Sequence, residues 1–326
     1  MSLTKSEKKI LSYIIKTIIV SLAAVFIYNK LSDNQNLKNF LQIINQLNAL
    51  AVSLVVSLIF LLMLLNWFLE SLKWQYLIGK IEKISLYKAI ESVFCGLTWA
   101  VFTPNRIGEY GGRIFFLSPR KRIQGMVAMS VGHIAQMVIT NVLGSLSLLW
   151  FIYNFIPLDA WLFTAFCFLV FMFCLFFILF YFNIKWLEGL LNNIGFLKRF
   201  KKYFSVLNRY HQTELTKVML YSLSRFAVFT TQYLLVIHLL IADIPFFPSA
   251  LMVFILFFIQ SALPSLDLLD IGVRSLTATY FFGYITNQEI AIMASTALIW
   301  FVNLIIPAIL GSFFVFKLNF FGNNNR

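Results

Sequence analysis

The chain has 326 residues, of which 60% are hydrophobic and only 12% charged, and its mean hydropathy is +0.83. Soluble domains carry roughly 25% charged residues, so this composition excludes an ordinary soluble enzyme and indicates a polytopic membrane protein. The formal net charge is +13. In a membrane protein such an excess of basic residues first indicates the topology of the chain, because Lys and Arg collect in cytoplasmic loops. We expect a single integral membrane domain over residues 1–326 and no nucleic-acid partner.

A membrane-spanning helix needs about 20 predominantly apolar residues. The sequence predicts six full spans, at residues 10–28, 49–69, 126–153, 158–182, 218–241 and 289–316. Lys16 interrupts the first of them and no small-residue cleavage motif follows, so we interpret it as a retained helix rather than a signal peptide. The three cysteines, Cys95, Cys167 and Cys174, fall in apolar stretches and are expected to be small core residues.

Two further apolar regions, residues 85–117 and 247–284, are interrupted by polar motifs at Pro104 and Pro264. Broken helices at membrane depth are tolerated only where protein surrounds them or where they line a cavity. We therefore predict two broken, re-entrant hairpins. Neither region contains a metal-binding pattern, and we expect no metal and no cofactor.

The basic residues are distributed very unevenly between the predicted loops. With the N-terminus placed in the cytoplasm, 19 of them, Lys73 included, fall on the cytoplasmic side, and only Lys30 and Lys38 fall outside. This predicts an N-in, C-in topology. The first hairpin must then enter from the cytoplasm and the second from outside, as in an inverted repeat with halves of about 49–153 and 218–316.

The longest cytoplasmic connection, about residues 183–217, mixes aromatic residues and leucines with basic residues. This pattern favours an amphipathic helix on the membrane surface, with its cations toward anionic head groups. The alternative is a solvated loop that is basic only because it is cytoplasmic.

The first interruption reads FTPNRIGEYGGR and contains Arg106, Glu109 and Arg113. In a helix Glu109 and Arg113 are an i, i+4 pair, and Arg106 lies three residues before Glu109. One glutamate cannot neutralise two arginines, so the group carries a positive excess. The guanidinium fork donates two parallel hydrogen bonds to phosphate, which makes a phosphate-bearing substrate the natural expectation.

Pro104 is expected to end the incoming helix, and Gly108, Gly111 and Gly112 to permit close backbone approach. The helix that follows would direct its N-terminal N–H groups at the anion. The alternative is a cytoplasmic loop in which Arg106 snorkels and the glycines serve helix packing only.

The second interruption reads QSALPSLDLLDIGVRSLTATY. Asp270 and Arg274 are again an i, i+4 pair, and Asp267 leaves a negative excess. We expect these three residues to complete a two-sided substrate site, with Pro264 and Gly272 shaping the backbone. The alternative is a solvated outer turn in which the aspartates cap the next helix.

Other polar residues in the predicted spans are secondary candidates. His133 and Gln136 are i, i+3 neighbours and suit hydrogen bonding between helices, with a proton relay as the alternative. Arg225 is expected to snorkel to the inner surface, and His238 to be structural.

These motifs carry a family resemblance that covers about residues 10–316. PNRIGEYGGR resembles the proline, arginine, glycine–glutamate and arginine motif of the transmembrane flippase-like domain of bacterial lysylphosphatidylglycerol synthases. IGVRSLTA resembles the second motif of that family, with Ser275 where a glutamate is common. The resemblance assigns the first motif to Pro104, Arg106, Gly108, Glu109 and Arg113, and the second to Gly272 and Arg274.

The resemblance implies a bacterial inner-membrane protein with paired re-entrant elements that moves or binds lipids with charged head groups. No loop is long enough for the cytosolic synthase domain, so we expect a lipid flippase for a phospholipid or a polyprenyl-linked glycolipid, and not a synthase. The alternatives are a membrane-embedded lipid-modifying transferase and a non-transporting partner of a separately encoded glycosyltransferase or lipid synthase.

Overall fold

The computed structural model describes residues 34–101, 103, 106–186, 189, 201–263 and 270–315. Within these ranges the chain forms helices and no β-strand. Five helical segments are long and apolar enough to cross a membrane: Ala49–Ile78, Pro119–Phe155, Ala160–Phe182, Gln212–Leu240 and Glu289–Val315. This is the all-α, membrane-embedded architecture that the composition predicts. The predicted first span, residues 10–28, lies outside the described residues.

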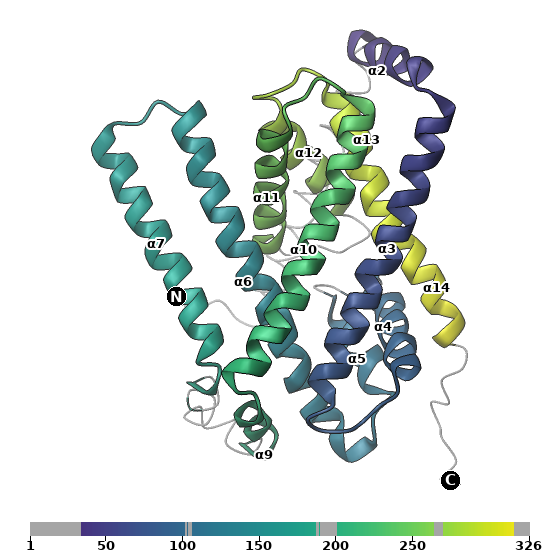
Figure 1. Cartoon of the computed structure of the whole chain (residues 1–326), viewed down its shortest axis with the longest axis vertical. Helices are drawn as coiled ribbons and strands as arrows, with labels where there is room; N and C mark the ends of the chain where they lie inside the picture. Colours follow the sequence, from purple (N-terminus) through teal and green to yellow (C-terminus); the bar gives the residue numbers. More distant parts are fainter. Residues whose placement is uncertain are drawn as a thin grey trace, which may run out of the picture.

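The spanning helices stand side by side along the long axis (Figure 1). They are α3 (Ala49–Ile78), α6 (Arg122–Phe155), α7 (Ala160–Phe182), α10 (Gln212–Leu240) and the pair α13 (Glu289–Trp300) and α14 (Ile306–Val315). A π-helical turn, Phe301–Ile305, joins α13 to α14. The outermost of these helices is α7, in which only Val170 and Tyr181 are buried and most of the other side chains are exposed.

Several helices extend beyond the predicted spans, and α3 shows why. Its upper part is mostly apolar and exposed, whereas its lower part buries Trp67, Glu70, Lys73 and Trp74. Hydropathy places the end of the span near residue 69, where polar residues begin. The helix continues to Ile78 because neighbouring helices cover and pair those polar side chains.

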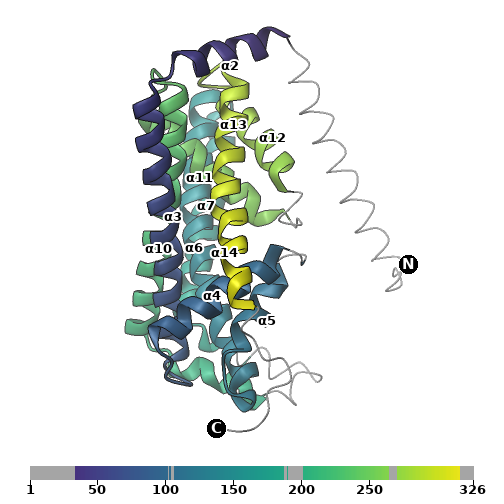
Figure 2. The ribbon, with the colours of Figure 1, turned by 90° about the vertical axis from the view of Figure 1, so that its right-hand side faces the viewer.

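Two shorter hairpins occupy opposite ends of the molecule. One consists of α4 (Leu86–Val101) and α5 (Ile107–Ile114), and the other of α11 (Phe246–Ala262) and α12 (Asp270–Phe282). Figures 1 and 2 show α4 and α5 in the lower part and α11 and α12 in the upper part. α4 and α11 end shortly before the predicted interruptions, whose prolines, Pro104 and Pro264, lie outside the described residues.

Each hairpin packs against a membrane-spanning segment from the other half of the chain. α11 packs on α6, where a Cβ added to Gly144 would lie 2.3 Å from the Cβ of Phe258. α4 packs on α14, where a Cβ added to Gly311 would lie 2.0 Å from the carbonyl oxygen of Phe94. Glycine is thus required at both crossings, as small residues are wherever membrane helices approach closely.

A helix that the sequence analysis does not predict, α2 (Asn34–Gln46), crosses the upper end of the bundle (Figure 2). Its apolar residues recur at helical spacing, yet Leu41 and Ile44 remain 50% and 41% exposed. A helix with an exposed apolar face at the end of a membrane bundle suits the membrane interface.

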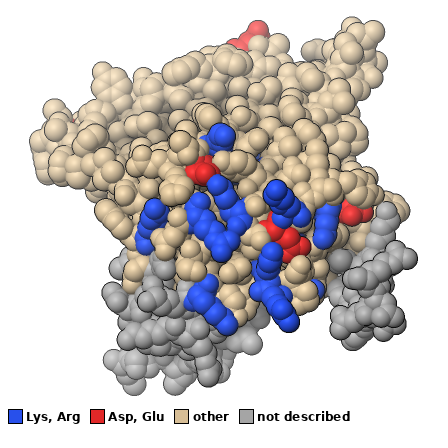
Figure 3. All heavy atoms as spheres, turned by 60° about the horizontal axis from the view of Figure 1, so that its bottom comes forward, with Lys and Arg blue, Asp and Glu red and all other residues tan. Residues whose placement is uncertain are grey.

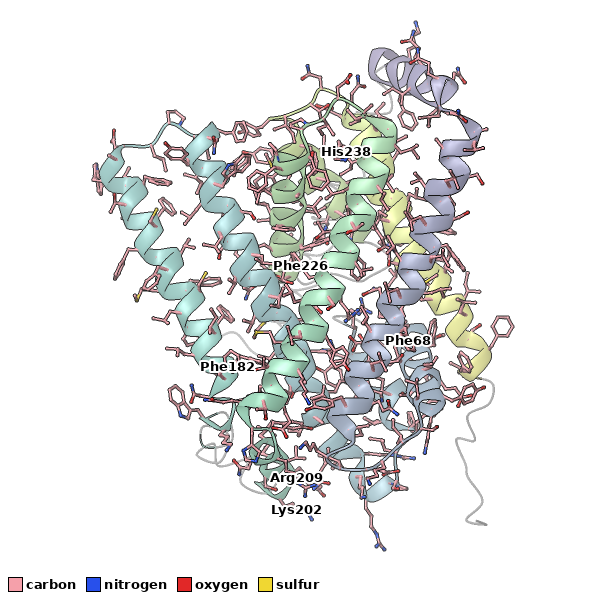
Figure 4. The ribbon with its side chains drawn as sticks, in the orientation of Figure 1. Phe68, Phe182, Lys202, Arg209, Phe226 and His238 are labelled. Carbon is pink, nitrogen blue, oxygen red and sulfur yellow. The ribbon has the colours of Figure 1, made fainter. Side chains whose placement is uncertain are left out.

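The lower end carries the basic residues (Figure 3). Lys202 of α9 (Lys201–Phe204) and Arg209 lie there, whereas His238 lies near the upper end of α10 and Phe226 near its middle (Figure 4). Phe226 packs against Phe254 and Phe257 and so joins α10 to α11.

The connection predicted at residues 183–217 is described only in part, so an amphipathic helix on the membrane surface stays a prediction. α10 already begins at Gln212, and the described part of the connection folds into α9 and the 3₁₀ turn Ser205–Arg209. Val206 and Leu207 are buried in the protein, and the Tyr210 hydroxyl donates to the Leu77 carbonyl at 2.9 Å. Burial raises the pKa of Tyr210, so the hydroxyl remains a donor. The described part of the connection thus packs against the lower end of the bundle.

Candidate functional site

The break in the first hairpin is organised around Thr103 and Arg106. Arg106 has φ of 56°, the left-handed conformation, and among the described residues no other non-glycine residue has a positive φ. The Thr103 hydroxyl accepts a 2.7 Å hydrogen bond from the Gly108 amide, which serves one unsatisfied N–H at the start of α5. The same hydroxyl donates toward the carbonyl of Trp99 at 3.1 Å. Pro104, which we expect to cause the break, lies outside the described residues.

The glycines of the first motif have different roles. A Cβ at Gly108 would lie 2.3 Å from the Trp99 carbonyl oxygen, and one at Gly112 would lie 2.5 Å from the Cα of Gly96. Gly108 and Gly112 therefore allow α5 to lie directly against α4. Gly111 differs, because a Cβ there would meet only the Trp99 ring, at 3.8 Å. Close packing does not require glycine at that position.

The three charged residues of the first motif do interact with one another. Glu109 pairs with Arg113 one turn later on α5, and the Arg106 Nε lies 3.2 Å from the second carboxylate oxygen of Glu109. The Arg113 and Glu109 side chains are 1% and 6% exposed, whereas that of Arg106 is 35% exposed. Arg106 is thus the member of the motif that can be reached from outside the protein.

A carboxylate that the sequence analysis misses lies at the centre of the site. Glu70 of α3 accepts from Arg113 Nη1 at 2.7 Å and pairs with Lys73 Nζ at 2.7 Å, and its second oxygen also pairs with Arg225 of α10. Arg225 Nε donates to the Asn66 Oδ1 at 2.9 Å. One carboxylate therefore joins α3, α5 and α10.

Two predictions are wrong at this point. Lys73 belongs to the buried part of α3 and not to a cytoplasmic loop, and Arg225 does not snorkel to the surface. Snorkelling lets a cation reach water when no partner is near. Here Glu70 is close enough to pair both cations inside the protein.

Among the described residues, the buried charges do not balance. Glu70 and Glu109 supply two negative charges, and Lys73, Arg113 and Arg225 supply three positive charges. The Arg225 Cζ lies 5.2 Å from the centre of the Trp67 ring, and the Arg113 Cζ lies 5.9 Å from the centre of the Trp74 ring. Both contacts add cation–π attraction. We call these five charged residues the buried cluster.

Unpaired hydrogen-bond donors accompany this positive excess. In the described part of the chain, four buried N–H groups on α3 and α5 have no acceptor: Asn66 Nδ2, Trp67 Nε1, Trp74 Nε1 and Arg113 Nε. A surplus of both charge and donors at one place suits an anion with several oxygen atoms.

The secondary candidates lie on α6, beside the first hairpin. The Tyr110 hydroxyl of α5 and the His133 Nδ1 are 2.9 Å apart, and their rings meet edge to face. His133 thus takes part in the hydrogen bonding between helices that the sequence suggests. Gln136, one turn further along, has a buried Oε1 without a hydrogen-bond partner in the described part of the chain.

Much of the second motif lies outside the residues that the structure describes. Pro264 and Asp267 are not among the described residues, and Asp270 begins α12 with a side chain that is not described. Gly272 is buried on α12, and Arg274 is half-buried one turn after Asp270. A joint site between the two motifs stays a prediction. Among the described residues, no three His, Cys, Asp or Glu side chains are grouped as metal ligands.

Comparisons with known proteins find neither a matching protein-family model nor a matching curated protein. The likeness of the two motifs to the flippase-like family therefore stays a resemblance.

Proposed function

We propose that this protein is a lipid transporter of the bacterial inner membrane that moves an anionic, phosphate-bearing lipid between the leaflets. The observation that carries the proposal is the buried cluster, which among the described residues has one positive charge in excess and four unpaired donors beside it. An ionisable group inside a membrane costs about 2.5–3.5 kcal/mol to insert on translocon scales, so an uncompensated cation there points to a function.

Phosphate fits this excess better than a carboxylate or a neutral sugar does. Its oxygen atoms can accept from several donors at once, and arginine binds it through two parallel N–H groups. The remaining carboxylates, Glu70 and Glu109, hold the arginines in place between substrates. Arg106, exposed at the break, is the first contact for an incoming head group.

The packing of the two hairpins supports an inverted repeat. Phe94 and Phe254 are 160 positions apart, as are Thr98 and Phe258, and the same spacing separates Pro104 from Pro264. Phe94 and Thr98 lie against Gly311 of the other half. Phe254 and Phe258 lie in the same way against Gly144. In transporters built from inverted repeats the substrate site lies near the membrane midplane, and one half moves against the other to expose it alternately.

The distribution of basic residues supports an N-in, C-in topology. They gather at the lower end, where the α4–α5 hairpin lies, while the α11–α12 hairpin lies at the other end (Figures 2 and 3). With the lower end in the cytoplasm, the first hairpin is re-entrant from inside and the second from outside.

Transport is testable with purified protein in liposomes of phosphatidylcholine that contain a trace of fluorescent phosphatidylglycerol. A membrane-impermeant quencher reports how fast the labelled lipid leaves the outer leaflet. We expect transport by the wild type and at least a tenfold slower rate for Arg106→Ala combined with Arg113→Lys. Lysine keeps the charge that pairs with Glu70 and Glu109 but removes the guanidinium fork.

Arg209→Ala is the matched control, because Arg209 is an exposed arginine at the lower end that bonds only a backbone carbonyl in the described chain. It should transport at the wild-type rate. No transport by the wild type would refute the function, whereas equal rates for the wild type and the double variant would refute this site alone.

A further inference from the structure

Two carboxamide side chains occupy corresponding places in the two halves of the chain. Gln136 on α6 lies eight residues before Gly144, and Asn303 in the π-helical turn lies eight residues before Gly311. Those glycines mark the two equivalent crossings with the hairpins. Gln136 and Asn303, here called the amide pair, are thus related by the same repeat that relates the hairpins.

The helix contacts place each amide beyond the end of a hairpin arm. On α6, Gly144 meets Phe258 and Asn141 meets Ser261, so α6 and α11 run antiparallel and Gln136 lies past the end of α11 at Ala262.

The other half repeats this geometry. Gly311 meets Phe94, and the Ala308 carbonyl accepts a 2.8 Å hydrogen bond from Thr98. α14 and α4 are therefore antiparallel too, and Asn303 lies past the end of α4 at Val101. Each amide accordingly lies beyond the end of the first arm of the opposite half's hairpin.

Both members of the amide pair have a buried oxygen atom that accepts no hydrogen bond from the described residues, Gln136 Oε1 and Asn303 Oδ1. The Asn303 Nδ2 donates to the Ile299 carbonyl at 3.1 Å, which fixes the side chain so that its oxygen is the unpaired atom. Asn303 is only 6% exposed. A buried acceptor without a donor is costly, and π-helical turns occur frequently at functional sites.

We propose that the amide pair recognises hydroxyl groups on the head group of the transported lipid, and this inference rests on the proposed function. An acceptor oxygen needs a donor, which a lipid can supply as a hydroxyl or an ammonium group. The excess positive charge of the buried cluster disfavours an ammonium group in the same head group. The phosphate then binds the cluster, and the amide pair selects lipids whose phosphate bears a hydroxylated substituent.

The test is a binding competition by native mass spectrometry on the full chain in detergent. The protein is offered equal amounts of phosphatidylglycerol and phosphatidic acid with identical acyl chains. Both contain phosphate, but only phosphatidylglycerol carries a hydroxylated head group. We expect the wild type to prefer phosphatidylglycerol, and Gln136→Leu combined with Asn303→Leu to lower the ratio of the two bound lipids about tenfold, because two hydrogen bonds are lost.

Asn154→Leu is the control, because Asn154 is an exposed amide on the same helix as Gln136. It should keep the wild-type ratio. The double variant should unfold at the same or a higher temperature than the wild type, since leucine removes two unsatisfied polar groups.

An unchanged ratio in the folded double variant overturns the inference, as does a wild type without preference. If the double variant loses the preference of the wild type but the wild type transports no lipid, the transport function is overturned and the hydroxyl site stands. A marked loss of thermal stability in the double variant means a structural role and overturns the inference.

Discussion

Arg113 Nη1 donates to Glu70 Oε1 at 2.7 Å, and this contact ties the short helix α5 to the spanning helix α3. The same carboxylate pairs with Lys73 and with Arg225 of α10. Glu70 therefore links the first hairpin to both long helices.

Replacing Glu70 should destabilise the protein strongly. Glu70→Gln keeps the size of the side chain but leaves Lys73, Arg113 and Arg225 with one carboxylate among them. Removing one partner of a buried ion pair costs about 3–5 kcal/mol, because a charge remains buried and uncompensated. Thermal unfolding of the purified protein in detergent measures the effect. Glu82→Gln is the control, since the Glu82 carboxylate bonds an exposed backbone amide, and equal losses in the two variants would contradict the role of Glu70.

The adjacent glycines 111 and 112 should respond oppositely to alanine. Gly112→Ala would place a Cβ 2.5 Å from the Cα of Gly96, so the two arms of the first hairpin must separate. Such overpacking costs about 1–3 kcal/mol. Gly111→Ala has room for its methyl group and should be neutral or stabilise by up to about 1 kcal/mol, because alanine favours a helix. The unfolding temperatures of the two variants test this prediction. A similar decrease in both would show that the described packing of α5 on α4 is wrong.

The two crossings between the halves should be equivalent. Gly144→Ala and Gly311→Ala each insert a methyl group where a neighbouring atom lies within 2.3 Å. Both variants should lose transport and stability to a similar extent, and Gly111→Ala should lose neither. Fluorescent-lipid transport and thermal unfolding measure these effects. If only one glycine is sensitive, the two hairpins do not function as equivalent halves.

The topology is testable by cysteine labelling. After Cys95, Cys167 and Cys174 are replaced by alanine, single cysteines are placed at Arg120 near the lower end and at Asn154 near the upper end of α6. An impermeant maleimide added to intact cells should label Asn154→Cys and not Arg120→Cys, and cell lysis should expose both. The reverse pattern in intact cells would invert the proposed orientation.

Much of the architecture could be predicted from local sequence. Hydropathy identifies α6, α7 and α10 because a helix in lipid needs a long apolar run to cover its backbone. Glycine and the charged motif identify the first hairpin break. The Glu109–Arg113 pair follows from helical spacing alone, since residues four apart share a face. The close approach at Gly108 and Gly112 follows from glycine's lack of a side chain.

Other features have no local signature. The helix α2 was missed because its mixture of polar and apolar residues resembles a loop when only long apolar runs are sought. The burial of Val206 and Leu207 under the bundle depends on which surface their apolar face meets. Gly111 looks like its neighbours in sequence but points where α4 leaves space.

By itself the sequence determined a membrane-embedded helical chain, its two breaks and the charged motif beside the first, because hydropathy and i, i+4 spacing act within one helix. Only the tertiary structure decided that Glu70 and Arg225, 155 positions apart, share a site. Such a pairing depends on which faces of separate helices meet, and that is set by the packing of the whole bundle. The same packing turned Lys73 from a presumed loop cation into a buried member of the cluster.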